Sequence, residues 1–121
     1  MSQEVKVSIA FSASKSGASV NGGTETQTFD MAGSNMTGDT QTVLSASWNA
    51  LSFGAISGAP SGFRIKNLDS TNYIQLSADS GGANPLVKLT AGKTNFISPV
   101  GTVYAKANSA NVKVQIYAAE A

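Results

Sequence analysis

Catalysis by this chain would depend mainly on carboxylates, because its 121 residues include no His and no Cys. His is the commonest general base near neutral pH, and it is the usual partner of a Ser nucleophile. Two facing carboxylates could hydrolyse a glycoside, but no spacing places two of them on one face of one predicted strand. We therefore predict a protein that is not an enzyme and has no catalytic residues. The acids are spread along the chain, at Glu4, Glu25, Asp30, Asp39, Asp69, Asp79 and Glu120.

A cation could be held only by oxygen ligands, because a chain without Cys has no thiolate site and no disulfide. The loop from Asp79 to Pro85 offers Asp79, Asn84 and the backbone carbonyls of Gly81 and Gly82, and calcium prefers such oxygens. The EF-hand spacing is absent from this loop. The sequence therefore predicts no metal site and no cofactor.

A binding surface is the remaining kind of site. Aromatic residues and Arg are enriched at the centres of protein interfaces, and this chain places Tyr, Arg and Lys at the polar positions of several predicted strands. A solvated strand face would carry the same residue types, so both interpretations stay open. The candidate interface residues are Arg64, Lys66, Tyr73, Tyr104, Lys106 and Tyr117.

The segment from Phe63 to Leu76 must position three of these residues. Phe63 and Ile65 alternate with Arg64 and Lys66, and a second alternating run, from Tyr73, places Ile74 and Leu76 together on one side. Period-two alternation of this kind is typical of a half-buried strand. The residues between the runs, Asp69 to Asn72, have side chains that stabilise turns. We predict a β-hairpin.

The rest of the chain repeats this pattern. Runs such as Val5–Phe11 and Val112–Ala118 alternate in the same way, and no segment of ten residues has a helical period. We predict one domain, residues 1–121, that is all-β with about eight antiparallel strands in a jelly-roll-like sandwich; an immunoglobulin-like sandwich is the alternative. Ser12–Gly23 is predicted to be a surface loop, and Trp48 is predicted to anchor the core.

Composition argues against two classes of partner. The net charge is +1 and only 12% of residues are charged, whereas nucleic-acid binding needs clustered Lys and Arg. No apolar run approaches the length of a membrane span. The first residues lack the apolar core of a signal peptide, so we expect synthesis in the cytoplasm. A surface rich in Ser, Thr, Asn and Gly suits either an ordinary β domain or a crowded assembly.

Three segments resemble a family of small structural proteins found in the virions of tailed bacteriophages. The resemblance is carried by Ile65–Ile74 (IKNLDSTNYI), by Pro85–Gly92 (PLVKLTAG) and by Val103–Ala107 (VYAKA), followed by the alternating run at the C-terminal end. It covers a little under half of the chain. The N-terminal half resembles no family.

The resemblance implies a non-enzymatic role on a phage particle. The implied function is that of a capsid decoration or minor capsid protein, located in the virion after synthesis in the host cytoplasm. Its implied partners are further copies of itself, with a trimer preferred, and other virion proteins such as the major capsid protein; nucleic acid and membrane are not among them. The alternative function is a carbohydrate- or receptor-binding module of a tail or head fibre.

Overall fold

The computed structural model describes residues 5–31, 36–54, 56, 60, 62–99 and 101–119. These residues form ten β-strands and no helix, and all paired strands are antiparallel. The prediction of an all-β antiparallel fold is confirmed. The chain divides into two compact units, residues 1–31 and 32–121.

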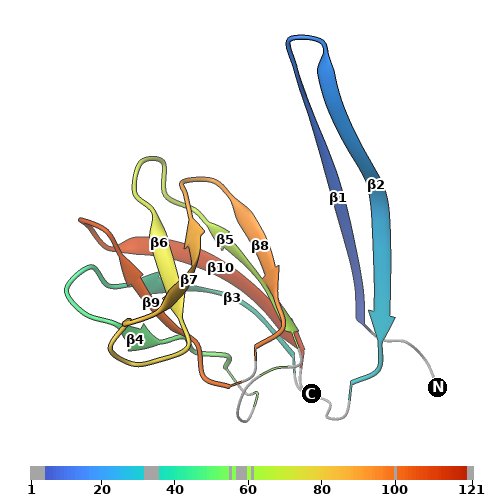
Figure 1. Cartoon of the computed structure of the whole chain (residues 1–121). Helices are drawn as coiled ribbons and strands as arrows, with labels where there is room; N and C mark the ends of the chain where they lie inside the picture. Colours follow the sequence, from blue (N-terminus) through green and yellow to red (C-terminus); the bar gives the residue numbers. More distant parts are fainter. Residues whose placement is uncertain are drawn as a thin grey trace. The chain divides into compact units, whose positions relative to one another are not determined.

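The first unit is a long β-hairpin, hereafter the arm. It pairs β1 (Val5–Lys15) with β2 (Ala18–Phe29) (Figure 1). Ser16 and Gly17 form the turn, and both have positive φ, at 51° and 85°. Positive φ at both central residues is the geometry of the two-residue turns that match the twist of paired strands.

The prediction that Ser12–Gly23 is a loop is wrong, because both strands of the arm continue through it. The pairing shifts between Phe11 and Ser12, where a β-bulge accommodates one extra residue of β2. The prediction depended on apolar alternation, and this segment has little because neither face of the arm is buried there. Backbone pairing and the tight turn, which leave no apolar pattern, define the strands instead.

The second unit, hereafter the sandwich, contains two four-stranded sheets (Figure 1). One sheet has the order β3-β10-β5-β8 and the other has the order β4-β9-β6-β7. The strands are β3 (Met36–Val43), β4 (Asn49–Ala50), β5 (Gly62–Asn67), β6 (Ile74–Ser77), β7 (Pro85–Leu89), β8 (Thr94–Ile97), β9 (Tyr104–Ala107) and β10 (Val112–Ala119).

The core lies between these two sheets. Phe63 and Ile65 of β5 are fully buried, as is Ile74 of β6, while the side chains that alternate with them are exposed or half-buried. Phe53 packs its ring against Phe63, with centroids 5.0 Å apart and planes inclined by 59°. The period-two pattern of the sequence therefore correctly identifies the faces of these strands that form the core.

The predicted hairpin from Phe63 to Leu76 is not a hairpin. Its first strand, β5, pairs with β10 and β8, whereas β6 pairs with β9 and β7 in the opposite sheet. The turn residues are as expected: the Asp69 carboxylate accepts hydrogen bonds from the backbone N–H groups of Thr71 (3.0 Å) and Asn72 (2.6 Å). The turn carries the chain from one layer to the other, because the apolar faces of both strands must meet in the core between the sheets.

Trp48 was predicted to anchor the core, but it is only half-buried and lies outside the cluster of buried apolar residues. It follows the end of β3 and packs instead against Gly82 in the loop between β6 and β7. Leu44, four residues earlier, is exposed. Because β3 ends at Val43, neither side chain lies on a strand that faces the core.

Candidate functional site

The six predicted interface residues are divided between the two sheets of the sandwich. Arg64 and Lys66 on β5 and Tyr117 on β10 belong to the sheet β3-β10-β5-β8. The other three belong to the opposite sheet or border it: Tyr104 and Lys106 lie on β9, and Tyr73 immediately precedes β6. The structure thus forms two clusters where the sequence suggested one surface.

Arg64 and Tyr117 form the first cluster. They are directly paired across β5 and β10, and the guanidinium carbon of Arg64 lies 4.6 Å from the centre of the Tyr117 ring. Arg64 Nη2 also donates a hydrogen bond of 3.1 Å to Gln115 Oε1. Stacking and this hydrogen bond both fix the orientation of the guanidinium, which remains exposed.

Two glycines give the aromatic rings of this sheet their positions. Gly38 is paired with Tyr117, and a Cβ atom at Gly38 would lie 2.8 Å from the Tyr117 ring. A Cβ atom at Gly62 would lie 2.5 Å from the Phe96 ring. Both rings therefore rest directly on the backbone of a neighbouring strand. Sequence reasoning missed Phe96, although it alternates with Asn95 and Ile97 and so occupies the outward position of β8.

Tyr73 and Lys88 form the second cluster, on the opposite sheet. The Lys88 ammonium lies 4.3 Å from the centre of the Tyr73 ring. Gln75 is paired with Lys88 on one side and with Lys106 on the other. A sugar that stacks on Tyr73 or Tyr117 would have to share the ring with a cation that already occupies it. These two rings therefore support protein contact better than carbohydrate stacking.

Asp79 organises the loop in which a calcium site was considered. Its carboxylate accepts hydrogen bonds from Ser77 Oγ (2.6 Å) and from the backbone N–H groups of Ala83 (2.9 Å) and Asn84 (3.4 Å). Proton donors thus surround the oxygens that a cation would need. Within the described residues, no group of three acids could hold a metal ion.

Hydrogen bonding to both loop carboxylates predicts sensitivity of the sandwich to acid. The Ser77 hydroxyl, together with backbone N–H groups, holds the pKa of Asp79 below its ordinary value of 3.8, and the N–H of Asn72 does the same to the pKa of Asp69. A carboxyl group whose pKa is lower in the folded chain than in the unfolded chain stabilises the fold at pH values above its unfolded-state pKa. This stability is lost as the pH falls through the folded-state pKa. We expect the urea midpoint to decrease below about pH 4. Asp69→Asn/Asp79→Asn should flatten that decrease; an equally steep profile would contradict the assignment.

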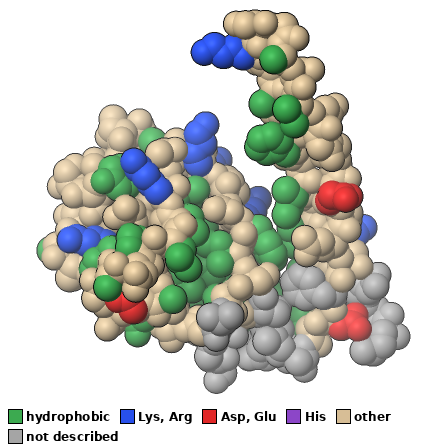
Figure 2. Space-filling model, in the orientation of Figure 1, with side chains coloured by type: hydrophobic (Ala, Val, Ile, Leu, Met, Phe, Trp, Pro, Cys, Tyr) green, Lys and Arg blue, Asp and Glu red, His purple; other side chains and the backbone are tan. Residues whose placement is uncertain are grey.

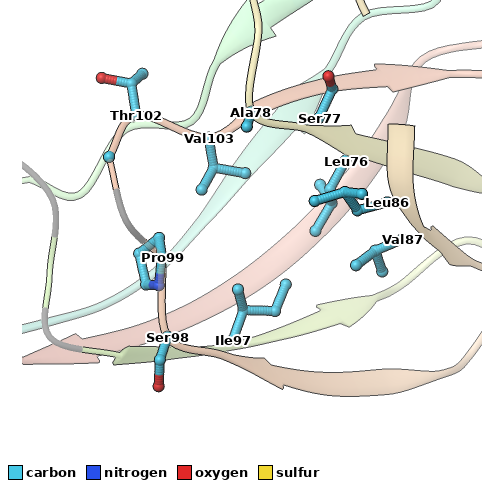
Figure 3. Close-up of a pocket in the computed structure, with 11 residues that line it drawn as sticks. Leu76, Ser77, Ala78, Leu86, Val87, Ile97, Ser98, Pro99, Thr102 and Val103 are labelled. Carbon is cyan, nitrogen blue, oxygen red and sulfur yellow. The ribbon is translucent and has the colours of Figure 1, made fainter. Parts of the chain in front are cut away.

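An apolar pocket opens beside β6, β7 and β8, with a volume of about 210 Å³ (Figure 3). Leu76, Leu86 and Val87 line one side of it, and Ile97, Pro99 and Val103 line the other. Among the lining residues that the structure describes, the polar side chains are Ser and Thr, and none is charged. The pocket therefore has no group that could perform acid–base chemistry.

The arm exposes an apolar stripe along β1 and the adjacent part of β2 (Figure 2). Pairing and alternation place the members of this stripe on one face, and Ile9, Phe11 and Val20 are 46%, 65% and 62% exposed. An isolated two-stranded hairpin is marginally stable in water. The stripe consists of the half-buried Val5 and Val7 and the exposed Ile9, Phe11 and Val20.

Comparison with known proteins adds no relative to this description. No protein family, curated protein or solved structure matches the chain. The described residues contain no helix that is long and apolar enough to cross a membrane.

Proposed function

We propose that this chain is a non-enzymatic structural protein of a bacteriophage virion, acting as a capsid decoration or minor capsid protein. The observation that carries the proposal is the arm. Exposed apolar side chains on a marginally stable hairpin are best explained by a partner that covers them, since large exposed apolar surfaces mark interaction sites. We infer that this partner belongs to a phage virion because Ile65–Ile74 resembles small virion proteins.

The strand order supports a jelly-roll-like topology within this proposal. Along the chain, β3, β4, β5 and β6 alternate between the two sheets, and β7, β8, β9 and β10 alternate again. Among the described strands of the sandwich, only the connection from β6 to β7 stays within a sheet. Jelly rolls consist of eight strands in two sheets and recur in viral capsids.

The proposed partners are other copies of the chain, as a trimer, and the major capsid protein. Closed rotational symmetry is the rule for homo-oligomers. The alternative, a carbohydrate- or receptor-binding module, has weaker support because cations already occupy the rings of Tyr73 and Tyr117.

The test is binding to particles of the encoding phage that were assembled without this chain. We expect the purified wild-type protein to co-sediment with such particles and to saturate at a fixed number of copies. Phe11→Lys should weaken binding at least about ten-fold, because a charge replaces a large apolar side chain of the stripe. The thermal midpoint of the sandwich, a separate unit, should not change.

Ser12→Lys is the matched control, because Ser12 is also exposed on β1 but lies on the opposite face of the arm from the stripe. This variant should bind like the wild type. Failure of the wild type to bind, together with absence of the chain from purified virions, would refute the proposed function. If Phe11→Lys binds as well as Ser12→Lys, the arm no longer supports the proposed function.

A further inference from the structure

The outer face of the sheet β3-β10-β5-β8 concentrates positive charge. Alternation places Arg64 and Lys66 of β5 and Lys113 of β10 on this face, together with the rings of Phe96 and Tyr117. We call this surface, defined by these five residues, the Arg64 face. Asp39 on β3 is paired with the inward-facing Ile116 and so does not share the outward alternation. Within the described part of the chain, no acid pairs with these three cations.

We propose that the Arg64 face binds an acidic surface of a neighbouring virion protein, with Arg64 receiving a carboxylate of that protein. This inference rests on the proposed function and names the chemistry of its partner. The Arg64 guanidinium is stacked on Tyr117 at 4.6 Å and uses Nη2 for Gln115. The Arg64 side chain is exposed, and a guanidinium can bind a carboxylate through two parallel hydrogen bonds.

The aromatic rings make the surface rigid before the partner arrives. Tyr117 and Phe96 lie over Gly38 and Gly62, so neither ring has to be immobilised during binding. Rigid aromatic and Arg side chains are the residues that most often dominate the affinity of an interface. The free energy needed to order side chains, which opposes most protein association, is correspondingly small here.

The size of the face suits a small protein contact. The four strands β3, β10, β5 and β8 contain 8, 8, 6 and 4 residues. At about 4.8 Å between strands and about 3.4 Å per residue, they give a surface of roughly 400 Å². A standard stable interface buries about 800 Å² on each partner. A contact of this size is weak alone and suits an assembly in which many copies bind side by side.

Nucleic acid fits the face less well. Three cations would displace about three counterions, whereas proteins with strong salt-dependent binding neutralise about six to ten phosphates. The Tyr117 ring is already stacked with Arg64. An acidic protein could bind with one well-oriented carboxylate at Arg64 and a negative potential around it that complements the positive face.

The experiment measures binding of the full chain to the particles described above, at two salt concentrations. Arg64→Ala should weaken binding about 30-fold, and Arg64→Lys should weaken it about ten-fold, because Lys keeps the charge but cannot form the two parallel hydrogen bonds. Lys93→Ala, which removes an exposed cation from the turn between β7 and β8, is the matched control and should bind normally. Thermal midpoints should stay close to the wild-type value, because Arg64 is exposed.

The outcomes separate this inference from the proposed function. If wild-type protein does not bind particles, the proposed function fails. If wild-type protein binds and both Arg64 variants bind equally well, only the inference fails. If Arg64→Ala abolishes self-association in light scattering and leaves particle binding unchanged, the inference fails and the face is assigned to contact between copies of the chain. Equal affinity for a 20-base-pair DNA duplex would also overturn the inference.

Discussion

Asn67→Ala is expected to lower the free energy of unfolding of the sandwich by about 3 to 4 kcal/mol. Asn67 is fully buried at the end of β5. Its Nδ2 donates to the carbonyls of Asn72 (2.9 Å) and Leu89 (3.0 Å), and its Oδ1 accepts from the N–H of Asp69 (2.8 Å). Alanine would remove all three bonds: the one to Leu89 is buried, and losing a buried partner costs about 1 to 3 kcal/mol, whereas the two to Asn72 and Asp69 are part-buried and cost less. The thermal midpoint should fall by about 15 to 25 °C.

Asn108→Ala is the matched control for this prediction. Asn108 accepts a hydrogen bond of 3.0 Å from the N–H of Tyr73, and this contact is exposed. Water can replace the lost side chain there, so the expected loss is below about 1 kcal/mol. Urea unfolding of both variants measures the difference. Equal losses would show that the buried network of Asn67 does not connect the two layers in the way that the structure indicates.

Gly82→Ala is expected to destabilise the sandwich by about 2 to 3 kcal/mol and to expose its single Trp. Gly82 has a φ of +65°, which L-residues rarely adopt. A Cβ atom at this position would overlap the indole of Trp48 at Cε2, Nε1 and Cζ2. The loop or the indole must therefore move. Trp fluorescence should shift to longer wavelength as the half-buried ring becomes solvated.

Gly92→Ala separates backbone strain from the clash. Gly92 has a φ of +74° and open space around its missing side chain. We expect this variant to lose about 1 to 2 kcal/mol through strain alone and to keep its Trp emission. Adding Trp48→Ala to Gly82→Ala should cost less than the sum of the two single changes, because the clash disappears. Strict additivity would disprove contact between Gly82 and Trp48.

Turns were recognised from the sequence better than strand pairing was. Asp69 and Asn72 were expected to reverse the chain, and their hydrogen bonds are present. The strands that this turn joins nevertheless belong to different sheets. The Asn108–Asn111 turn likewise connects β9 and β10, which lie in opposite sheets. A turn is stabilised by side chains of its own four residues. The pairing of the strand that follows is determined by burial against segments that are distant in the chain.

The sequence also predicted the outward position of the interface candidates better than it predicted which of them lie together. The sequence marked Arg64, Lys66 and Tyr117 as outward, and the structure places them together because β5 and β10 are neighbours. The sequence could not show that Tyr104 and Lys106 belong to the opposite sheet. Nor could it show that Gly38 makes room for the Tyr117 ring, since that contact joins residues far apart in the chain.

Period-two alternation, by itself, determined that this protein is all-β and which residues of the central strands are buried. Alternation is a local property, because successive side chains of any strand point to opposite faces. The tertiary structure alone decided that Ser12–Gly23 extends the arm and that Phe63–Leu76 crosses between the layers of the sandwich. These outcomes depend on which distant strands supply backbone hydrogen bonds and a shared core, and the residues of one segment do not encode that choice.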